Sequence, residues 1–204
     1  MRIQYSYPKL YQLLVHKLLY PKELWDKLRG EVGENQSVFD LTAGYGYASR
    51  FLHPSNTYYG IDLNKRFVAY GRKKGINLEL KSIFDPAAYK SSDIIMVIDI
   101  IHHLPSDKLK ELFNLVFQHA KQKVIVIDPA FVSIARKHGS LGKFLGWVFR
   151  LLDDDGITKI EKWLSEKEYQ ELFQSRFTSE YGKKFTVNSH RVAGYHFVVF
   201  TENI

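Results

Sequence analysis

The sequence predicts an α/β protein built on a doubly wound, parallel sheet. Three observations predict this class. Short apolar runs alternate with stretches of helical spacing between about residues 35 and 130. One run, residues 94–98, is apolar throughout, which is typical of a strand buried on both faces of a parallel sheet. Two further strand-like runs, residues 185–187 and 195–200, lie near the C-terminus.

The N-terminal segment, residues 1–34, is expected to be helical. Between residues 8 and 30, leucines and a tryptophan recur at spacings of three and four, and Pro21 interrupts the pattern. This spacing places the apolar side chains on one face of two short helices, which can pack against the sheet.

A glycine-containing turn follows the first strand, residues 38–41. Gly44 and Gly46 lie in this turn, and a helix is predicted from about Tyr47 to Leu52. A turn without side chains lets the backbone approach a ligand, and the first turn of a helix presents unpaired N–H groups to it. The turn therefore indicates a site for an anionic or nucleotide-like ligand.

Asp62 ends the next apolar run. In nucleotide-binding α/β sheets, a carboxylate about 20 residues beyond the glycine turn accepts hydrogen bonds from ribose hydroxyls. Together with the turn, Asp62 predicts a cofactor that contains a nucleoside.

The middle of the chain continues the alternation. Asn64 is expected to cap a helix that ends near Gly75, and a short strand over residues 76–80 follows it. Ser106 is expected to cap another helix, and residues 124–128 form the fifth strand, which stops at Pro129.

The fourth strand, residues 94–98, delivers Asp99, His102 and His103 to its carboxyl end. Open α/β sheets place their sites at this edge. We therefore expect these three side chains at or beside the site.

The pattern after Pro129 is helical. Residues 141–152 are apolar on nearly every side of the predicted helix. We interpret them as an ordinary buried helix. The alternatives are a wall of the substrate pocket and a contact with a membrane surface. Asp153–Asp155 are interpreted as a solvated loop in preference to a metal site, because adjacent carboxylates diverge. Ser165–Glu168 is a capping box that opens a helix through Phe173.

Three segments carry a resemblance to a known family. They are Asp40-x-Thr42-x-Gly44-x-Gly46, Gly60-Ile61-Asp62, and Asp99-Ile100-Ile101-His102-His103-Leu104-Pro105. In this order and spacing they resemble the class I S-adenosylmethionine-dependent methyltransferases of the small-molecule branch. Thr42 stands where that family has its first glycine.

The resemblance implies a Rossmann-like sheet of seven strands, mostly parallel with an antiparallel C-terminal strand, in one domain, residues 1–204. Within it, residues 1–34 would be a helical segment or lid, residues 35–130 the cofactor-binding half, and residues 131–204 the substrate-side helices and terminal strands. The implied cofactor is S-adenosyl-L-methionine. The positions implied to hold it are Asp40, Thr42, Gly44, Gly46, Asp62, Leu63, Ser82, Ile83 and Asp99.

Methyl transfer from a sulfonium is a direct displacement, which needs positioning and exclusion of water but no metal. No metal ligands are therefore assigned. An acceptor that loses a proton needs a base, and imidazole titrates in the right range. His102 and His103 are the candidates, and the alternative for either one is a supporting hydrogen bond to the backbone.

Composition limits the partners. The chain of 204 residues has a net charge of +7 and no cysteine, so disulfides and thiolate catalysis are excluded. The expected partner is a small-molecule acceptor, hydrophobic or aromatic to suit the apolar 141–152 stretch. No apolar run is long enough to span a bilayer, and a cytoplasmic protein is expected. The sequence does not predict the oligomeric state.

Three alternatives remain open at this stage. The positive charge allows an RNA or protein methyltransferase, although the basic residues are dispersed and nucleic acid is not favoured. Thr42 allows a catalytically silent binding or regulatory protein with the same fold. A nicotinamide-dependent oxidoreductase is the weakest alternative, because Ser49 stands where its third glycine belongs.

Overall fold

The computed structural model describes residues 8, 20–129, 166–176 and 184–203. The predicted 9–19 helical spacing, the apolar stretch 141–152, the loop 153–155 and the capping residue Ser165 lie outside them.

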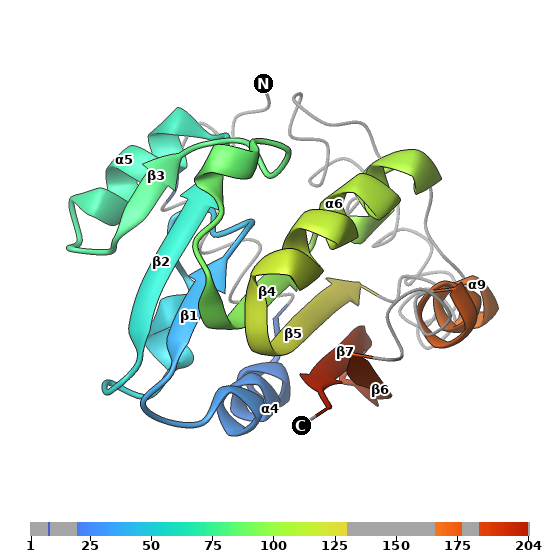
Figure 1. Cartoon of the computed structure of the whole chain (residues 1–204). Helices are drawn as coiled ribbons and strands as arrows, with labels where there is room; N and C mark the ends of the chain where they lie inside the picture. The colour runs from blue at the N-terminus through green and yellow to red at the C-terminus, as the bar shows by residue number, and fades with distance from the viewer. Residues whose placement is uncertain (1–7, 9–19, 130–165, 177–183, 204) are drawn as a thin grey trace, which may run out of the picture.

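Seven strands form one sheet in the order β3-β2-β1-β4-β5-β7-β6 (Figure 1). Neighbouring strands run parallel except at β7, which is antiparallel to both β5 and β6. This arrangement confirms the predicted Rossmann-like, mostly parallel seven-stranded sheet. The strands are β1 (Ser37–Asp40), β2 (Thr57–Asp62), β3 (Leu78–Leu80), β4 (Ser92–Ile98), β5 (Ala120–Pro129), β6 (Phe185–Val192) and β7 (Tyr195–Glu202).

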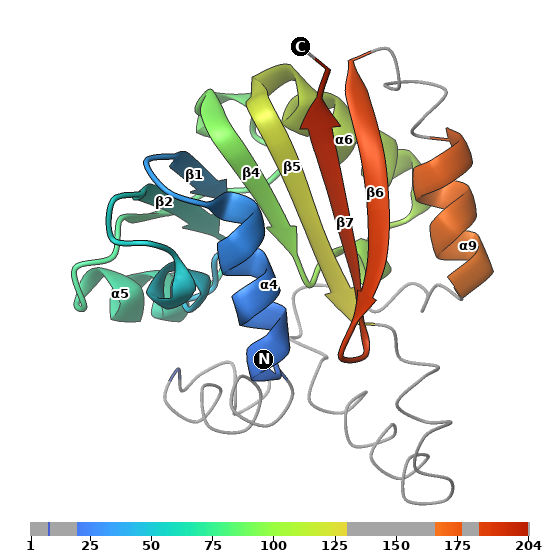
Figure 2. The same cartoon turned by 90° about the horizontal axis from the view of Figure 1, so that it is seen from below.

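Helices cover both faces of the sheet (Figure 2). One core cluster joins α6 and α9 to one face, and a second cluster joins α4 and Phe67 of α5 to the other. Both clusters include buried residues of β4, β5 and β7, so the centre of the sheet is covered on both sides. The described helices are α4 (Lys22–Val32), α5 (Lys65–Arg72), α6 (Ser106–His119) and α9 (Glu166–Gln170), which continues as a π-helical turn, η5 (Glu171–Arg176).

The prediction of a helix from Tyr47 to Leu52, after the glycine turn, is wrong. The chain forms only a 3₁₀ turn there, η2 (Ala48–Phe51). Leu52 is extended, and the next residue, His53, precedes Pro54, which disfavours helical backbone at His53. A single short 3₁₀ turn therefore stands where the sequence predicts a helix with several unpaired N–H groups.

The two predicted caps differ. Asn64 accepts hydrogen bonds from the backbone N–H groups of Arg66 and Phe67, so its capping role is confirmed. The Ser106 prediction is wrong, because Pro105, whose side chain has no hydrogen-bond acceptor, occupies the cap position of α6. Ser106 is instead the first residue of the helix.

Candidate functional site

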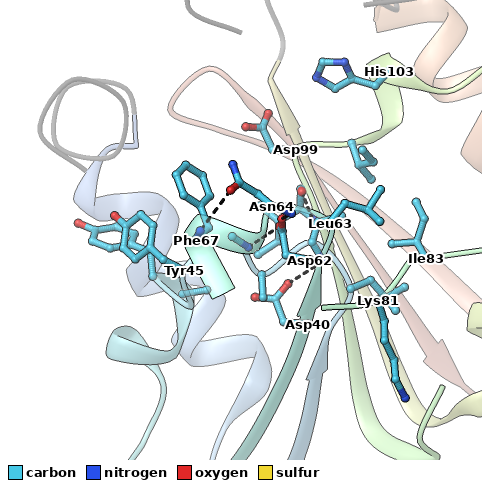
Figure 3. A pocket seen from close by; sticks show the side chains of 18 of the residues that line it. Asp40, Tyr45, Asp62, Leu63, Asn64, Phe67, Lys81, Ile83, Asp99 and His103 are labelled. Carbon is cyan, nitrogen blue, oxygen red and sulfur yellow. Dashed lines mark hydrogen bonds between the residues drawn. The ribbon is translucent and has the colours of Figure 1, made fainter. Parts of the chain in front are cut away.

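A pocket opens at the carboxyl ends of β1, β2 and β4 (Figure 3). The chain builds β2 and β3 on one side of β1 and then returns to build β4 and β5 on the other. The strand order therefore reverses between β1 and β4, which is where open α/β sheets bind ligands. The sequence-predicted residues that line the pocket are Asp40, Thr42, Gly44, Asp62, Leu63, Ile83, Asp99 and His103.

Asp40 ends β1 and lies at the base of the pocket. Its side chain is buried, accepts a hydrogen bond from the Tyr58 hydroxyl at 2.7 Å, and accepts a longer one from the Thr42 N–H at 3.3 Å. Burial raises the pKa of Asp40 to about 7, and the nearby Asp62 charge also raises it, whereas these two hydrogen bonds act in the opposite direction.

Thr42 joins β1 to β4 with its side chain. The Thr42 hydroxyl donates to the Ile98 carbonyl at 2.6 Å and accepts from the Ile98 N–H at 3.0 Å. Asp40 and Met96 are the last paired residues of β1 and β4. The Thr42 hydroxyl therefore joins the two chain segments beyond the point where strand pairing ends. A glycine at this position could not make either bond.

Asp62 and Gly44 hold each other in place. The Gly44 N–H donates to one Asp62 carboxylate oxygen at 2.8 Å, and the Asn64 N–H donates to the other at 2.7 Å (Figure 3). Gly44 has a φ of 56°, in the left-handed region that glycine adopts without strain. The glycine turn and the end of β2 are therefore fixed to each other through a single carboxylate.

Gly46 and Ser82 are not among the lining residues. Gly46 has a φ of 79°, and a Cβ on it would lie 2.7 Å from Ile76 Cγ2, so glycine is needed here for packing. The Ser82 hydroxyl accepts a hydrogen bond from the Phe84 N–H at 3.1 Å and thereby shapes the bend after β3.

Asp99 lies at the rim of the pocket, immediately after β4. Its φ of 60° is left-handed, a conformation that aspartate tolerates better than most residues. Its N–H donates to the Ile127 carbonyl at 2.8 Å, and its carboxylate accepts a hydrogen bond from the Tyr20 hydroxyl at 2.5 Å. These contacts fix the direction of the Asp99 side chain.

The two histidines have different environments. His103 lines the pocket, whereas His102 is buried and is not among the lining residues. His102 Nδ1 is 2.9 Å from Asp128 Oδ1, and the same oxygen accepts the Ile101 N–H at 3.1 Å. The two imidazole centroids are 4.2 Å apart. His103 can therefore face a ligand, while His102 and Asp128 support the segment that carries it.

Asp99, His102 and Asp128 together could offer ligand atoms to a metal ion, since these atoms lie within 4.8 Å of one another. The contact between His102 and Asp128 is already a hydrogen-bonded pair without any ion.

Sequence reasoning missed Asp128 and the aromatic wall of the pocket. Asp128 follows the apolar run of β5 in the same way that Asp99 follows β4, so the same pattern could have identified it. Tyr20 and Trp25 also line the pocket, and they reach it through the packing of the α4 region, for which the sequence has no local signal.

Comparisons with known proteins support the fold. No protein-family model matches the sequence, and neither does any curated protein. Solved structures do match. DhpI, in a complex named DhpI–SAM–HEP, has a TM-score of 0.67 and 16% identity, covering 98% of this chain and 92% of DhpI. Magnesium protoporphyrin IX methyltransferase (ChlM) from Synechocystis PCC 6803 with bound SAM has a TM-score of 0.55 and 11% identity, covering 88% of this chain and 75% of ChlM.

A third match is a protein from Nostoc punctiforme PCC 73102 named as a candidate O-methyltransferase, with a TM-score of 0.63 and 14% identity. The alignment covers 87% of this chain but 55% of the Nostoc protein, so this chain spans little more than half of that protein's length. Identities this low establish the fold alone. The chain has a Rossmann-like fold, which it shares with solved structures that are named as methyltransferases. Within the described residues, no helix has the length and apolar character needed to cross a membrane.

Proposed function

We propose that the protein is an S-adenosylmethionine-dependent methyltransferase that transfers a methyl group to a small, hydrophobic or aromatic acceptor. The observation that carries the proposal is the pocket built around Asp62, whose carboxylate is held by the Gly44 and Asn64 N–H groups. Several solved structures with this fold are named as complexes with S-adenosylmethionine or its demethylated product.

The residues present fit the cofactor. Asp62 lines the pocket, and a carboxylate is an acceptor with about four positions, which suits the hydroxyls of a ribose. Leu63 lines the pocket and is 50% exposed, an apolar surface that a flat adenine ring would cover. Ile83 also lines the pocket and supplies a second apolar surface.

S-Adenosylmethionine, when bound, would supply an electrophilic methyl group on a positively charged sulfur. The protein's part is then to hold the acceptor in line, exclude water and accept a proton. His103 lines the pocket and is placed to take the proton of an O–H or N–H acceptor. His102 and Asp128 support His103 from the buried side.

The apolar residues around His103 favour a hydrophobic or aromatic acceptor. Phe84, Ile100 and Leu104 line the pocket together with His103, and all three pack against the same core cluster. An aromatic or aliphatic acceptor would bury this surface, at a gain of about 25 cal/mol per Å² of apolar area removed from water.

Calorimetric titration with S-adenosylmethionine and S-adenosylhomocysteine tests the cofactor assignment. We expect saturable binding to the wild-type protein and a loss of at least about tenfold in affinity for Asp62→Asn, which keeps one acceptor oxygen but lacks the charge. Asp85→Asn is a matched control, because Asp85 caps the short turn Pro86–Ala88 outside the pocket. Failure of the wild-type protein to bind either compound would refute the assignment.

A second experiment tests the acceptor. Methyl-labelled cofactor is incubated with the protein and with separate fractions of metabolites, RNA and protein. Label in apolar metabolites is the expected result, whereas label confined to RNA or protein would contradict the proposed acceptor class. Cofactor binding without transfer to any fraction would contradict enzymatic activity while leaving the cofactor site intact.

A further inference from the structure

The surface formed by η2 and α5 carries an excess of positive charge. Residues 41–78 contain six lysines and arginines but one acidic residue, Asp62, whose carboxylate accepts backbone N–H groups at the pocket. All six basic residues are exposed: Arg50, Lys65, Arg66, Arg72, Lys73 and Lys74. The net charge of +7 is therefore unevenly distributed over the described surface.

Basic residues on other elements have carboxylate partners. Lys27 of α4 pairs with Glu31 at 2.6 Å. Lys184, next to the start of β6, pairs with Glu202 at 3.4 Å. Four basic residues of η2 and the α5 segment form no ion pair within the part of the chain that the structure describes: Arg50, Lys65, Lys73 and Lys74. Their charges are not compensated locally, so they attract an anionic partner.

Contacts between cations and tyrosine rings join η2 to α5. The Arg50 guanidinium lies 5.4 Å from the ring centroid of Tyr47. The Lys74 amino group lies 4.8 Å from that of Tyr70. Tyr45 contacts both tyrosines edge-on, with centroid distances of 5.9 Å to Tyr47 and 5.7 Å to Tyr70. These five residues form a continuous basic and aromatic surface, which we call the Arg50–Lys74 strip.

The Arg50–Lys74 strip borders the pocket. Tyr45 and Tyr47 line the pocket, and Phe67, a third lining residue, contacts Tyr45 from α5. Tyr47 and Tyr70 are half-buried, so each ring is partly accessible from outside. The α5 end of the strip lies beside β2 and β3 (Figures 1 and 2). A partner that binds the strip is therefore held next to the pocket.

The chemistry of the strip suits the surface of an anionic membrane. Lysine and arginine are attracted to anionic lipid headgroups, and tyrosine is favoured at the boundary between headgroups and hydrocarbon. A single-stranded nucleic acid, in contrast, stacks its bases on open ring faces. On Tyr47 and Tyr70, a cation of the protein already lies over one face of each ring. These contacts favour a lipid surface over RNA.

We propose that the Arg50–Lys74 strip, together with Lys65 and Lys73, binds the anionic surface of a lipid bilayer. Bound in this way, the protein holds its pocket next to the bilayer, where a hydrophobic acceptor concentrates. The choice of a lipid surface rests in part on the proposed function, because that function supplies the hydrophobic acceptor.

Sedimentation with lipid vesicles tests the proposal without cofactor or acceptor. The whole chain is mixed with vesicles of phosphatidylcholine, or of phosphatidylcholine and phosphatidylserine, at about 0.1 M salt. We expect at least about tenfold stronger partitioning onto the vesicles that contain phosphatidylserine. Partitioning should weaken at about 1 M salt, where the Debye length is about 3 Å.

Two outcomes of this experiment would overturn the inference. One is equal partitioning onto both kinds of vesicle, and the other is partitioning that salt does not weaken. Either outcome leaves the proposed function intact, because no cofactor is present. Failure of the calorimetric titration with S-adenosylmethionine, in turn, would refute the proposed function whatever the vesicles show.

A double variant, Arg50→Gln with Lys74→Gln, assigns the binding to the strip. We expect it to partition onto the vesicles that contain phosphatidylserine at least about tenfold more weakly than the wild type. Lys27→Gln with Lys184→Gln is the matched control, because it also removes two positive charges that lie over aromatic rings. The control should partition as the wild type does. Equal weakening of both double variants would show that only net charge matters and would overturn the assignment.

Binding of single-stranded RNA by the same proteins separates a lipid partner from a nucleic acid. We expect the two double variants to have equal affinities for RNA, because each has lost two positive charges. If the Arg50→Gln, Lys74→Gln variant loses affinity for RNA but keeps its affinity for the vesicles, the strip is a nucleic-acid surface and the inference is overturned.

Discussion

Asp40 is a carboxylate in a place that disfavours its charge. It is buried at the base of the pocket, and Asp62, a second carboxylate, is close enough to raise its pKa further. The Tyr58 hydroxyl offsets part of this effect by donating to Asp40. The pocket therefore contains a group that is partly protonated near neutral pH.

The raised pKa predicts how the stability of the protein changes with pH. With a folded-state pKa of about 7 and an ordinary value of 3.8, folded Asp40 binds more protons than unfolded Asp40 between about pH 4 and 7. Its contribution to the free energy of unfolding therefore falls as pH rises through this range. As pH rises from 4.5 to 8, the free energy of unfolding of Asp40→Asn should therefore increase by about 1–4 kcal/mol relative to that of the wild type.

Urea unfolding of both proteins at these two pH values measures this gain. Asp26→Asn removes the same charge from an exposed position on α4 and serves as the control. If Asp40→Asn and the wild type keep a constant stability difference across the range, Asp40 does not have the raised pKa.

Thr42 shows why one residue can depart from a family pattern without loss of the turn. Its hydroxyl makes two hydrogen bonds to Ile98 and links the ends of β1 and β4. The turn itself depends on Gly44, whose positive φ and bond to Asp62 are both present. The Thr42 side chain is therefore a structural link between these two strands.

At the scale of elements, the segment after β1 depends on close packing. Gly46 approaches Ile76, in the loop between α5 and β3, so closely that a methyl group would overlap its side chain. The four-residue turn η2 that follows is held by α4, through the stack of Trp25 on Phe51. Tertiary contacts replace the helix that local sequence predicted.

Gly46→Ala is expected to lower the free energy of unfolding by about 1–3 kcal/mol, from overlap with Ile76 and from strain at a positive φ. Gly30→Ala is the matched control. Gly30 lies within α4, where an added Cβ would meet no neighbouring group within 4 Å, so alanine should raise stability there by about 0.5–1 kcal/mol. Chemical unfolding measures both variants, and a neutral Gly46→Ala would contradict the packing argument.

At the scale of the whole molecule, strand positions were predictable because apolar runs alternate with turn residues, and this pattern survives in the fold. Asp62 and Asp99 were predictable for the same reason, since each is the first polar residue after a strand's apolar run. Trp25 was not predictable as a site residue. Its spacing indicates only an apolar helix face, and the pocket adjoins that face because α4 packs beside the end of the sheet.

The separation of His102 from His103 was also beyond the sequence. Two adjacent histidines look equivalent in a chain, but the short turn η4 (Ile101–His103) directs one ring to buried Asp128 and leaves the other at the pocket. The partner that distinguishes them is 26 residues away from His102. Long-range contacts of this kind decide which of two similar residues can meet a ligand.

The whole molecule should be stabilised by the proposed cofactor. A ligand that binds only the folded state adds about 2.7 kcal/mol at a concentration 100 times its dissociation constant. For a chain of 204 residues this corresponds to a rise of about 5–10 °C in the melting temperature. Thermal unfolding with and without S-adenosylhomocysteine, followed by dialysis to remove it, should show the rise and its reversal.

Salt separates this effect from one that arises from the net charge of +7. S-Adenosylhomocysteine has no net charge when its amino acid is zwitterionic, so its stabilising effect should persist between about 50 and 300 mM salt. Stabilisation by RNA would fall steeply over the same range, because binding of phosphates to basic residues releases counterions. A thermal shift with RNA that exceeds the shift with S-adenosylhomocysteine at low salt would favour a nucleic-acid acceptor, because the basic surface would then be part of substrate binding.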